Sequence, residues 1–184
     1  MLAFVFWHSP RPGVDRSEYE ERLLGFQRTM TAAPPAGFYG CSTHRLDGVP
    51  WLDDGTPYED WYLVADFAAL GDLNEAAVEG ARRSPHDQVA AQASAGIGGV
   101  YARWFGHPAP DARVDGRHRW FAKPDGMAYE ELRAQLVHGV PEGAVVWRRQ
   151  MTLGPTPEFC LTEIEPVDLP WPTIDVIATR LAGA

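Results

Sequence analysis

The chain has 184 residues, of which 45% are hydrophobic and 11% aromatic, and its formal net charge is −9. This composition supports a packed core and excludes disorder of the chain as a whole, while the acidic balance argues against a nucleic-acid partner. No run reaches the roughly 18 apolar residues of a membrane span. The two cysteines form no CxxC pair, so we expect a reduced, cytoplasmic protein without a membrane partner.

The first half reads as strand, helix, two strands, helical segment and strand. An apolar run predicts a strand at Leu2–His8. Ser17 and Glu20 form a capping box that opens a helix, which Pro34 and Pro35 end. The pattern then predicts strands at 38–46 and 60–67, a short helix from Leu73, a helix opening at Ser84-Pro85, and a strand at 96–106.

The order then begins again after a Pro- and Asp-containing stretch at 107–116, which we interpret as a linker. A strand is predicted at 117–124, a helix at 128–139, and strands at 144–153 and 159–166. The tail from Trp171 is predicted to be a short helix, and no fourth strand is evident. The predicted organisation is therefore one unit at 1–106, a linker at 107–116 and a shorter second unit at 117–184.

Three markers recur in the same order in both halves. Tyr-Glu-Glu stands at 19–21 and 129–131, Pro-x-Gly at 35–37 and 141–143, and a proline three residues before an acidic–aromatic pair at 57–61 and 155–159. A strand–helix–strand–strand unit covers only one face of its sheet, so two units can bury their open faces against each other. The sequence therefore predicts an α+β fold of two tandem units, the second degenerate, with antiparallel sheets packed face to face. On this interpretation the paired glutamates are solvated helix-start residues rather than catalytic ones.

The stretches "FVFWHSPRPGVDRSEYEERL" and "LNEAAVEGARRSPHDQVAAQASAGIGGVY" resemble the dimeric α+β barrel superfamily. That superfamily is built from ferredoxin-like units, and the first half most resembles its EthD-like and antibiotic-biosynthesis-monooxygenase-like groups. The position that matches a histidine frequent in EthD-like proteins is Gln27 here. The resemblance implies a cavity for a small hydrophobic or aromatic molecule, with cofactor-independent monooxygenase-like chemistry.

Three histidines are the candidate catalytic residues. His8, His44 and His118 all lie on predicted strands, where side chains alternate between faces. His8 shares a face with Phe4 and Phe6, and His118 shares one with Trp120. Each could shuttle a proton in a barrel cavity, or could be an ordinary strand-end histidine.

The candidate ligand-binding residues are Trp61, Arg103, Trp147 and Arg148. Aromatic walls suit a flat ligand, and a mid-strand arginine needs either an internal carboxylate or an open polar cavity. The Pro-x-Gly markers align Ser42 with Arg148, so the halves differ in polarity at equivalent positions. This difference favours one functional cavity and one filled one.

The function expected is binding or transformation of a small hydrophobic or aromatic molecule. The alternative is a non-catalytic ligand-binding or structural protein with a filled barrel. The discriminating observation is a pocket beside His8, His44 or Arg148. No cofactor and no metal are expected, with histidine-held haem as the lesser alternative, and a homodimer stays open.

Overall fold

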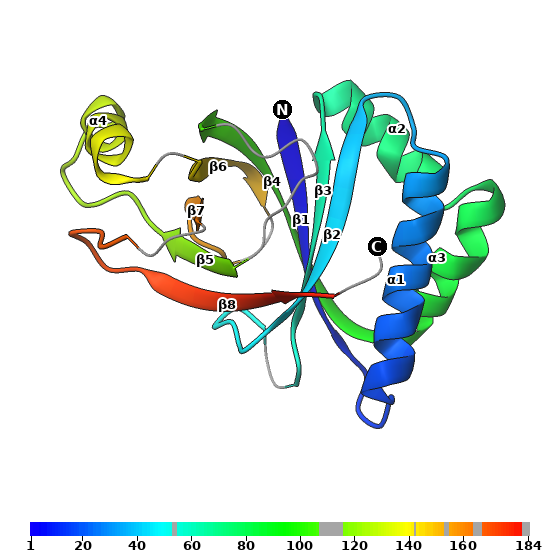
Figure 1. Cartoon of the computed structure of the whole chain (residues 1–184). Coiled ribbons are helices and arrows are strands. Elements are labelled where there is room, and N and C mark those ends of the chain that lie inside the picture. The colour runs from blue at the N-terminus through cyan, green and yellow to red at the C-terminus, as the bar shows by residue number, and fades with distance from the viewer. Residues whose placement is uncertain (53–54, 107–115, 142, 153–154, 164–166, 182–184) are drawn as a thin grey trace.

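The computed structural model describes residues 1–52, 55–106, 116–141, 143–152, 155–163 and 167–181 (Figure 1). In these ranges the chain forms eight strands and four helices. Their order is β1 (Leu2–Pro10), α1 (Arg16–Ala32), β2 (Phe38–Leu46), β3 (Tyr58–Val64), α2 (Phe67–Ala77), α3 (Gly80–Gln92), β4 (Ala93–Phe105), β5 (Gly116–Phe121), α4 (Tyr129–Gly139), β6 (Val145–Thr152), β7 (Phe159–Glu163) and β8 (Ile174–Arg180).

The strands close into one antiparallel barrel, in the order β1-β3-β2-β8-β5-β7-β6-β4. Each half of the chain contributes four adjacent strands, β4-β1-β3-β2 from the first and β8-β5-β7-β6 from the second. Both halves therefore place their first strand between their third and fourth, with the second strand at the edge. The halves join where β2 pairs with β8 and where β4 pairs with β6. The fold is thus α+β with a closed barrel, and closure leaves no unpaired sheet edge.

The helices cover the outside of the barrel unequally. Figure 1 shows α1, α2 and α3 on one side, against the first-half strands, and α4 alone on the opposite side. Leu132 and Leu136 of α4 pack on Phe121, Val146 and Phe159, which point outward from the second-half strands. The interior cluster instead draws residues from strands of both halves, so the barrel has one shared core.

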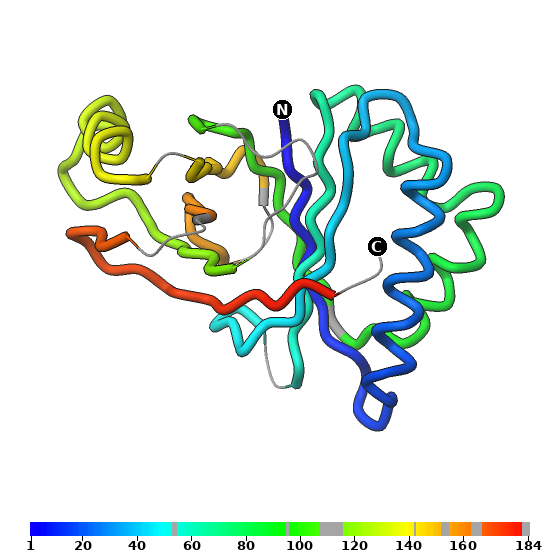
Figure 2. Tube along the Cα trace, in the orientation of Figure 1, coloured from blue at the N-terminus to red at the C-terminus, as the bar shows by residue number. Residues whose placement is uncertain are grey.

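The predicted helix in the tail is wrong, because Ile174–Arg180 forms strand β8. Its burial alternates, with Val176 and Ala178 inside and Ile177 exposed, which is the period of a strand. The strand pairs with β2 on one side and with β5 on the other. Figure 2 shows this segment, in red, running from the second-half strands toward the first-half strands. A helix here would leave both of those strands with an open edge.

Helix starts also differ from the sequence prediction. The N-cap of α1 is Asp15, whose carboxylate accepts the backbone N–H of Glu18 at 3.0 Å, so the predicted Ser17 cap is wrong. Helix α2 starts at Phe67 behind the N-cap Asp66, earlier than the predicted Leu73. Helix α3 begins at Gly80 and carries Pro85 inside it, whereas a start at Ser84 was predicted.

Of the predicted linker, residues 107–115 lie outside the described residues, and Gly116 is the first residue of β5. Among the residues that the structure describes, no helix is both long and apolar enough to cross a membrane.

Candidate functional site

Aromatic side chains fill the barrel interior. Alternation along β1 turns Ala3, Val5 and Trp7 inward, and the same rule brings in Trp61 from β3, Trp120 from β5 and Trp147 from β6. The four indoles are fully buried. Trp51, from the segment between β2 and β3, packs edge-on against Trp7 and Trp120 with ring centroids 5.6 Å away in each case. Aromatic rings therefore pack against one another across the barrel interior.

A carboxylate lies inside this cluster. Glu59 on β3 is fully buried, and its Oε1 lies 2.5 Å from Nδ1 of His118 on β5. The indole N–H of Trp7 donates to Glu59 Oε2 at 2.7 Å, and that of Trp61 donates to Oε1 at 2.5 Å. His44 on β2 completes the group, with its ring centroid 5.2 Å from that of His118. We call Glu59, His44 and His118 the inner cluster.

The inner cluster is electrostatically coupled. Burial by itself raises the pKa of the Glu59 carboxyl. The charge and hydrogen bond of His118, the charge of His44 and the Trp61 N–H together outweigh burial, and the pKa is held below its ordinary value. Glu59 is therefore ionised at neutral pH. A buried carboxylate–histidine contact of this kind is a weak source of net stability, and groups with a shifted pKa are frequent at functional sites.

The structure brings together four of the residues singled out from the sequence, namely His44, His118, Trp61 and Trp147. Trp61 contacts both His118 and Trp147, with ring centroids 5.6 Å away from each. Glu59 was missed by the sequence reasoning. The sequence does indicate its direction, because Glu59 is two residues from Trp61 and side chains two apart on a strand share a face. An acidic residue at the start of a strand is, however, usually solvent-exposed, so this position was not singled out.

His8 lies apart from this cluster, on the outer face of β1 beneath α1. Its Nδ1 lies 2.7 Å from the Tyr19 hydroxyl, and its Nε2 lies 3.3 Å from Asp60 Oδ2. Its neighbour Trp7 faces inward, so alternation places His8 on the outer face of the barrel, away from the interior that it was expected to line.

Asp60 is the centre of this second network. The Thr43 hydroxyl donates to Asp60 Oδ1 at 2.5 Å, and the Tyr62 hydroxyl to Oδ2 at 3.3 Å. The Gln27 amide in turn donates to Thr43. We call His8, Tyr19, Asp60, Thr43 and Gln27 the outer network. Most of its donors and acceptors bond each other, as expected of a structural polar network under a helix, while Gln27 Oε1 is buried without a hydrogen-bond partner among the described residues.

Arg148 also lies on the outside. Its Nε contacts Glu158 Oε1 at 3.2 Å, and its guanidinium lies over the Tyr129 ring at 3.9 Å, where it is partly exposed. Ser42 faces inward beside Trp61, so the alignment of Ser42 with Arg148 joins positions on opposite faces and is wrong. A bulge at Phe38/Gly40 in β2 shifts the alternation there. Arg103 is half-buried on β4 and is paired with Trp147 of the neighbouring strand β6.

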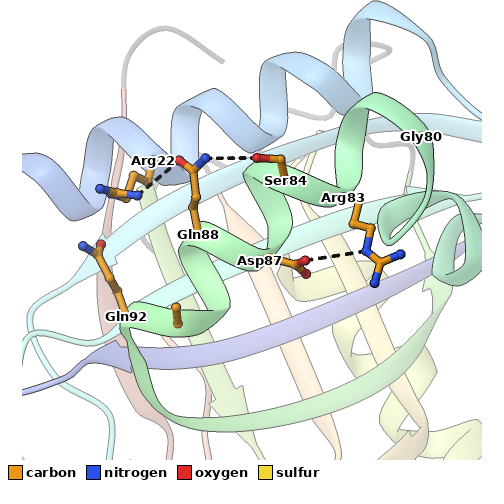
Figure 3. Close-up of a pocket in the computed structure, with 8 residues that line it drawn as sticks. Arg22, Gly80, Arg83, Ser84, Asp87, Gln88 and Gln92 are labelled. Atoms are coloured by element: carbon orange, nitrogen blue, oxygen red, sulfur yellow. Dashed lines mark hydrogen bonds and ion pairs between the residues drawn. The ribbon is translucent and has the colours of Figure 1, made fainter.

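A surface groove of about 680 Å³ lies between α1 and α3 (Figure 3). Arg22 and Gln88 bond each other across it at 3.1 Å, and Arg83 pairs with Asp87 at 3.7 Å. None of His8, His44 and Arg148 lines this groove. Its charged side chains are already paired, Arg83 with Asp87 and Arg22 with Glu18, so it has the character of an ordinary helix–helix surface. Within the described ranges, no three His, Cys, Asp or Glu side chains are placed to hold a metal ion.

Comparison with known proteins gives little. No family model matches the chain, and no curated protein matches it. Among solved structures, the chain is similar to one described as "Crystal structure study of anthrone oxidase-like protein", with 13% sequence identity and a TM-score of 0.47. The similarity covers 87% of this chain and 70% of that one. No conclusion about fold or activity follows from a similarity at this level.

Proposed function

We propose that the barrel binds a small hydrophobic or aromatic molecule and that His118 accepts a proton from it. The observation that carries this proposal is the fully buried Glu59 carboxylate, bonded to His118 Nδ1 and to two indole N–H groups. When His118 is neutral, the carboxylate on Nδ1 fixes the tautomer and orientation of the imidazole and leaves Nε2 as its basic nitrogen, so the proton-acceptor role requires the neutral form. Glu59 is then a positioning residue, and His44 lies beside the proton acceptor.

The finer form of the proposal is a cofactor-independent, monooxygenase-like or EthD-like enzyme built from two ferredoxin-like units. The shared strand order of the two halves, β4-β1-β3-β2 and β8-β5-β7-β6, supports two such units. The proposed reaction begins with proton abstraction from an acidic C–H or O–H of the ligand and needs no cofactor for that step. Haem was the lesser alternative in the sequence analysis, and the residues around His118 do not fit it, because His118 has no exposed surface and packs among fully buried indoles.

2-Naphthol tests the proton-acceptor role, because its ionised form has a distinct absorption band. We expect the folded protein to increase the naphtholate fraction at neutral pH, and His118→Gln to abolish the increase. The matched control is His8→Gln, which removes a buried histidine of the outer network instead. Circular dichroism of each variant establishes that it is folded at the assay temperature. Binding of naphthol without any change in ionisation, in both wild type and H118Q, would exclude the proton-acceptor role.

A non-catalytic barrel is the second candidate function, and the packing of the interior favours it. Trp7, Trp61, Trp120 and Trp147 are fully buried, and His44 and His118 have no exposed surface. If no aromatic probe raises the unfolding temperature, the barrel is filled and the inner cluster is structural, because a ligand that binds only the native state must raise it.

A further inference from the structure

The buried indoles of the barrel fall into two groups. Trp7 and Trp61 donate their N–H to Glu59. In the part of the chain that the structure describes, the N–H groups of Trp51, Trp120 and Trp147 are buried with no hydrogen-bond partner. The hydroxyl of Ser42, which faces the same interior, is also buried without a hydrogen-bond partner among the described residues. Native proteins leave few buried polar groups unbonded, so each one points to a partner or a role.

The unpartnered indoles belong to one continuous set of rings. Trp51 lies 5.6 Å from Trp120, Trp120 lies 6.4 Å from Trp61, and Trp61 lies 5.6 Å from Trp147, measured between ring centroids. Trp61 also contacts His118. The unpartnered donors therefore surround the same interior as the inner cluster.

The chemistry of these groups restricts what can bind them. An indole N–H donates a hydrogen bond and accepts none, so its partner must carry an acceptor atom. The surrounding rings favour a flat aromatic body that stacks or packs edge-on. Trp51 comes from the β2–β3 segment, whereas the other rings stand on barrel strands. Because the barrel interior is filled, the ligand has to take the place of a side chain, and replacing Trp51 by a ring of similar size would leave every strand pairing intact.

We infer that the barrel ligand is a flat, indole-sized aromatic molecule that carries a carbonyl-type acceptor, bound by the N–H groups of Trp120 and Trp147. This inference rests on the proposed function and narrows its ligand class. A hydrophobic molecule without an acceptor would fill the space but leave those donors unbonded.

Isothermal titration with 1-indanone and indane tests the inference, because these bicyclic molecules differ only by one carbonyl oxygen. We expect 1-indanone to bind wild type roughly tenfold more tightly than indane, the value of about one net hydrogen bond. The ratio of the two affinities should fall to about one in Trp147→Phe or Trp120→Phe, because these variants keep an aromatic ring and remove the N–H. Trp51→Ala should bind 1-indanone more tightly than wild type does, since the truncation opens an apolar cavity in advance.

Trp171→Phe is the matched control. Its N–H is also without a partner among the described residues, but its ring packs on Phe121, outside the barrel. The tenfold preference should persist in W171F. Equal binding of both probes to wild type would overturn the acceptor requirement and leave the proposed hydrophobic site standing. Binding of neither probe, to wild type or to W51A, would overturn both.

Discussion

Glu59 on β3 and His118 on β5 lie 2.5 Å apart, although their strands are not neighbours in the barrel and come from different halves of the chain. On the next residue of β3, Asp60 faces the opposite way and meets His8. One strand thus supplies a carboxylate–histidine pair to each of its faces. The inner pair links the two halves of the molecule, and His8 of the outer pair contacts the Tyr19 hydroxyl of α1.

We expect Glu59→Gln to lower the free energy of unfolding by about 1–3 kcal/mol, because it removes the buried carboxylate to which Trp7, Trp61 and His118 are bonded. For a chain of this size the unfolding midpoint should fall by roughly 2–12 °C. Differential scanning calorimetry measures the change. Glu131→Gln, on the exposed side of α4, is the control and should leave the midpoint nearly unchanged. A Glu59→Gln midpoint equal to that of wild type would contradict the coupling of the inner cluster.

The inner cluster should also make stability depend on pH. The folded-state pKa of Glu59 lies below its unfolded value, so the unfolded chain binds more protons between the two. The contribution of Glu59 is therefore complete above the unfolded pKa and is lost as pH falls through the folded pKa. Urea unfolding of wild type and E59Q should differ most at neutral pH and converge in acid. Because the pair is buried, added salt should change the neutral-pH difference little. If the stability difference between wild type and E59Q instead grew as pH falls, the folded-state pKa of Glu59 would not lie below its unfolded value.

Trp61→Phe and Trp147→Phe form a matched pair inside the barrel. Both replace a fully buried indole by a smaller ring, but only Trp61 donates to the Glu59 carboxylate. A hydrogen bond to a charged group contributes about 1.5–3 kcal/mol, so W61F should be less stable than W147F by roughly that amount. Chemical denaturation of the two variants compares them directly. Equal losses would mean that packing alone accounts for both indoles.

The outer network should stabilise the fold through the Tyr19 hydroxyl. Tyr19→Phe removes its buried contact with His8 at 2.7 Å and should cost about 1–3 kcal/mol. Tyr39→Phe, at an exposed position on β2, is the matched control and should be near neutral. Hydrogen exchange offers a second measurement, since the amides of α1 should exchange faster in Y19F. Unchanged exchange in α1 would show that the network does not hold the helix.

Both cysteines should react slowly in the folded protein. Burial raises the pKa of the Cys41 thiol to about 12 and that of Cys160 well above its ordinary value, so little thiolate is present at pH 8. Titration with a chromogenic disulfide reagent should show two thiols in guanidinium and almost none in native buffer over several minutes. Rapid release of one equivalent from the native protein would show that a cysteine is accessible.

The sequence by itself determined many of the local elements. Periodicity identified β1, β2 and the helical stripe of Tyr19, Leu23, Phe26 and Met30, because burial of one face imposes a period on the chain. Alternation also assigned His118 and Trp120 to one face, and both lie inside the barrel. The same information could not choose between strand and helix for the tail, since Ile174–Arg180 is a strand only because β2 and β5 both need a partner there.

Tertiary structure decided which strand faces meet. From the sequence, His8, His44 and His118 were equally good candidates. In the closed barrel His44 and His118 lie together inside, and His8 lies outside. The register of strand pairing decides which side chains face the same side of the barrel, and a local sequence pattern does not show that register. The partner of Glu59, His118, lies on β5, which belongs to the other half of the chain. A long-range contact of this kind depends on how the sheets close, and it therefore lay beyond what the order of residues could show.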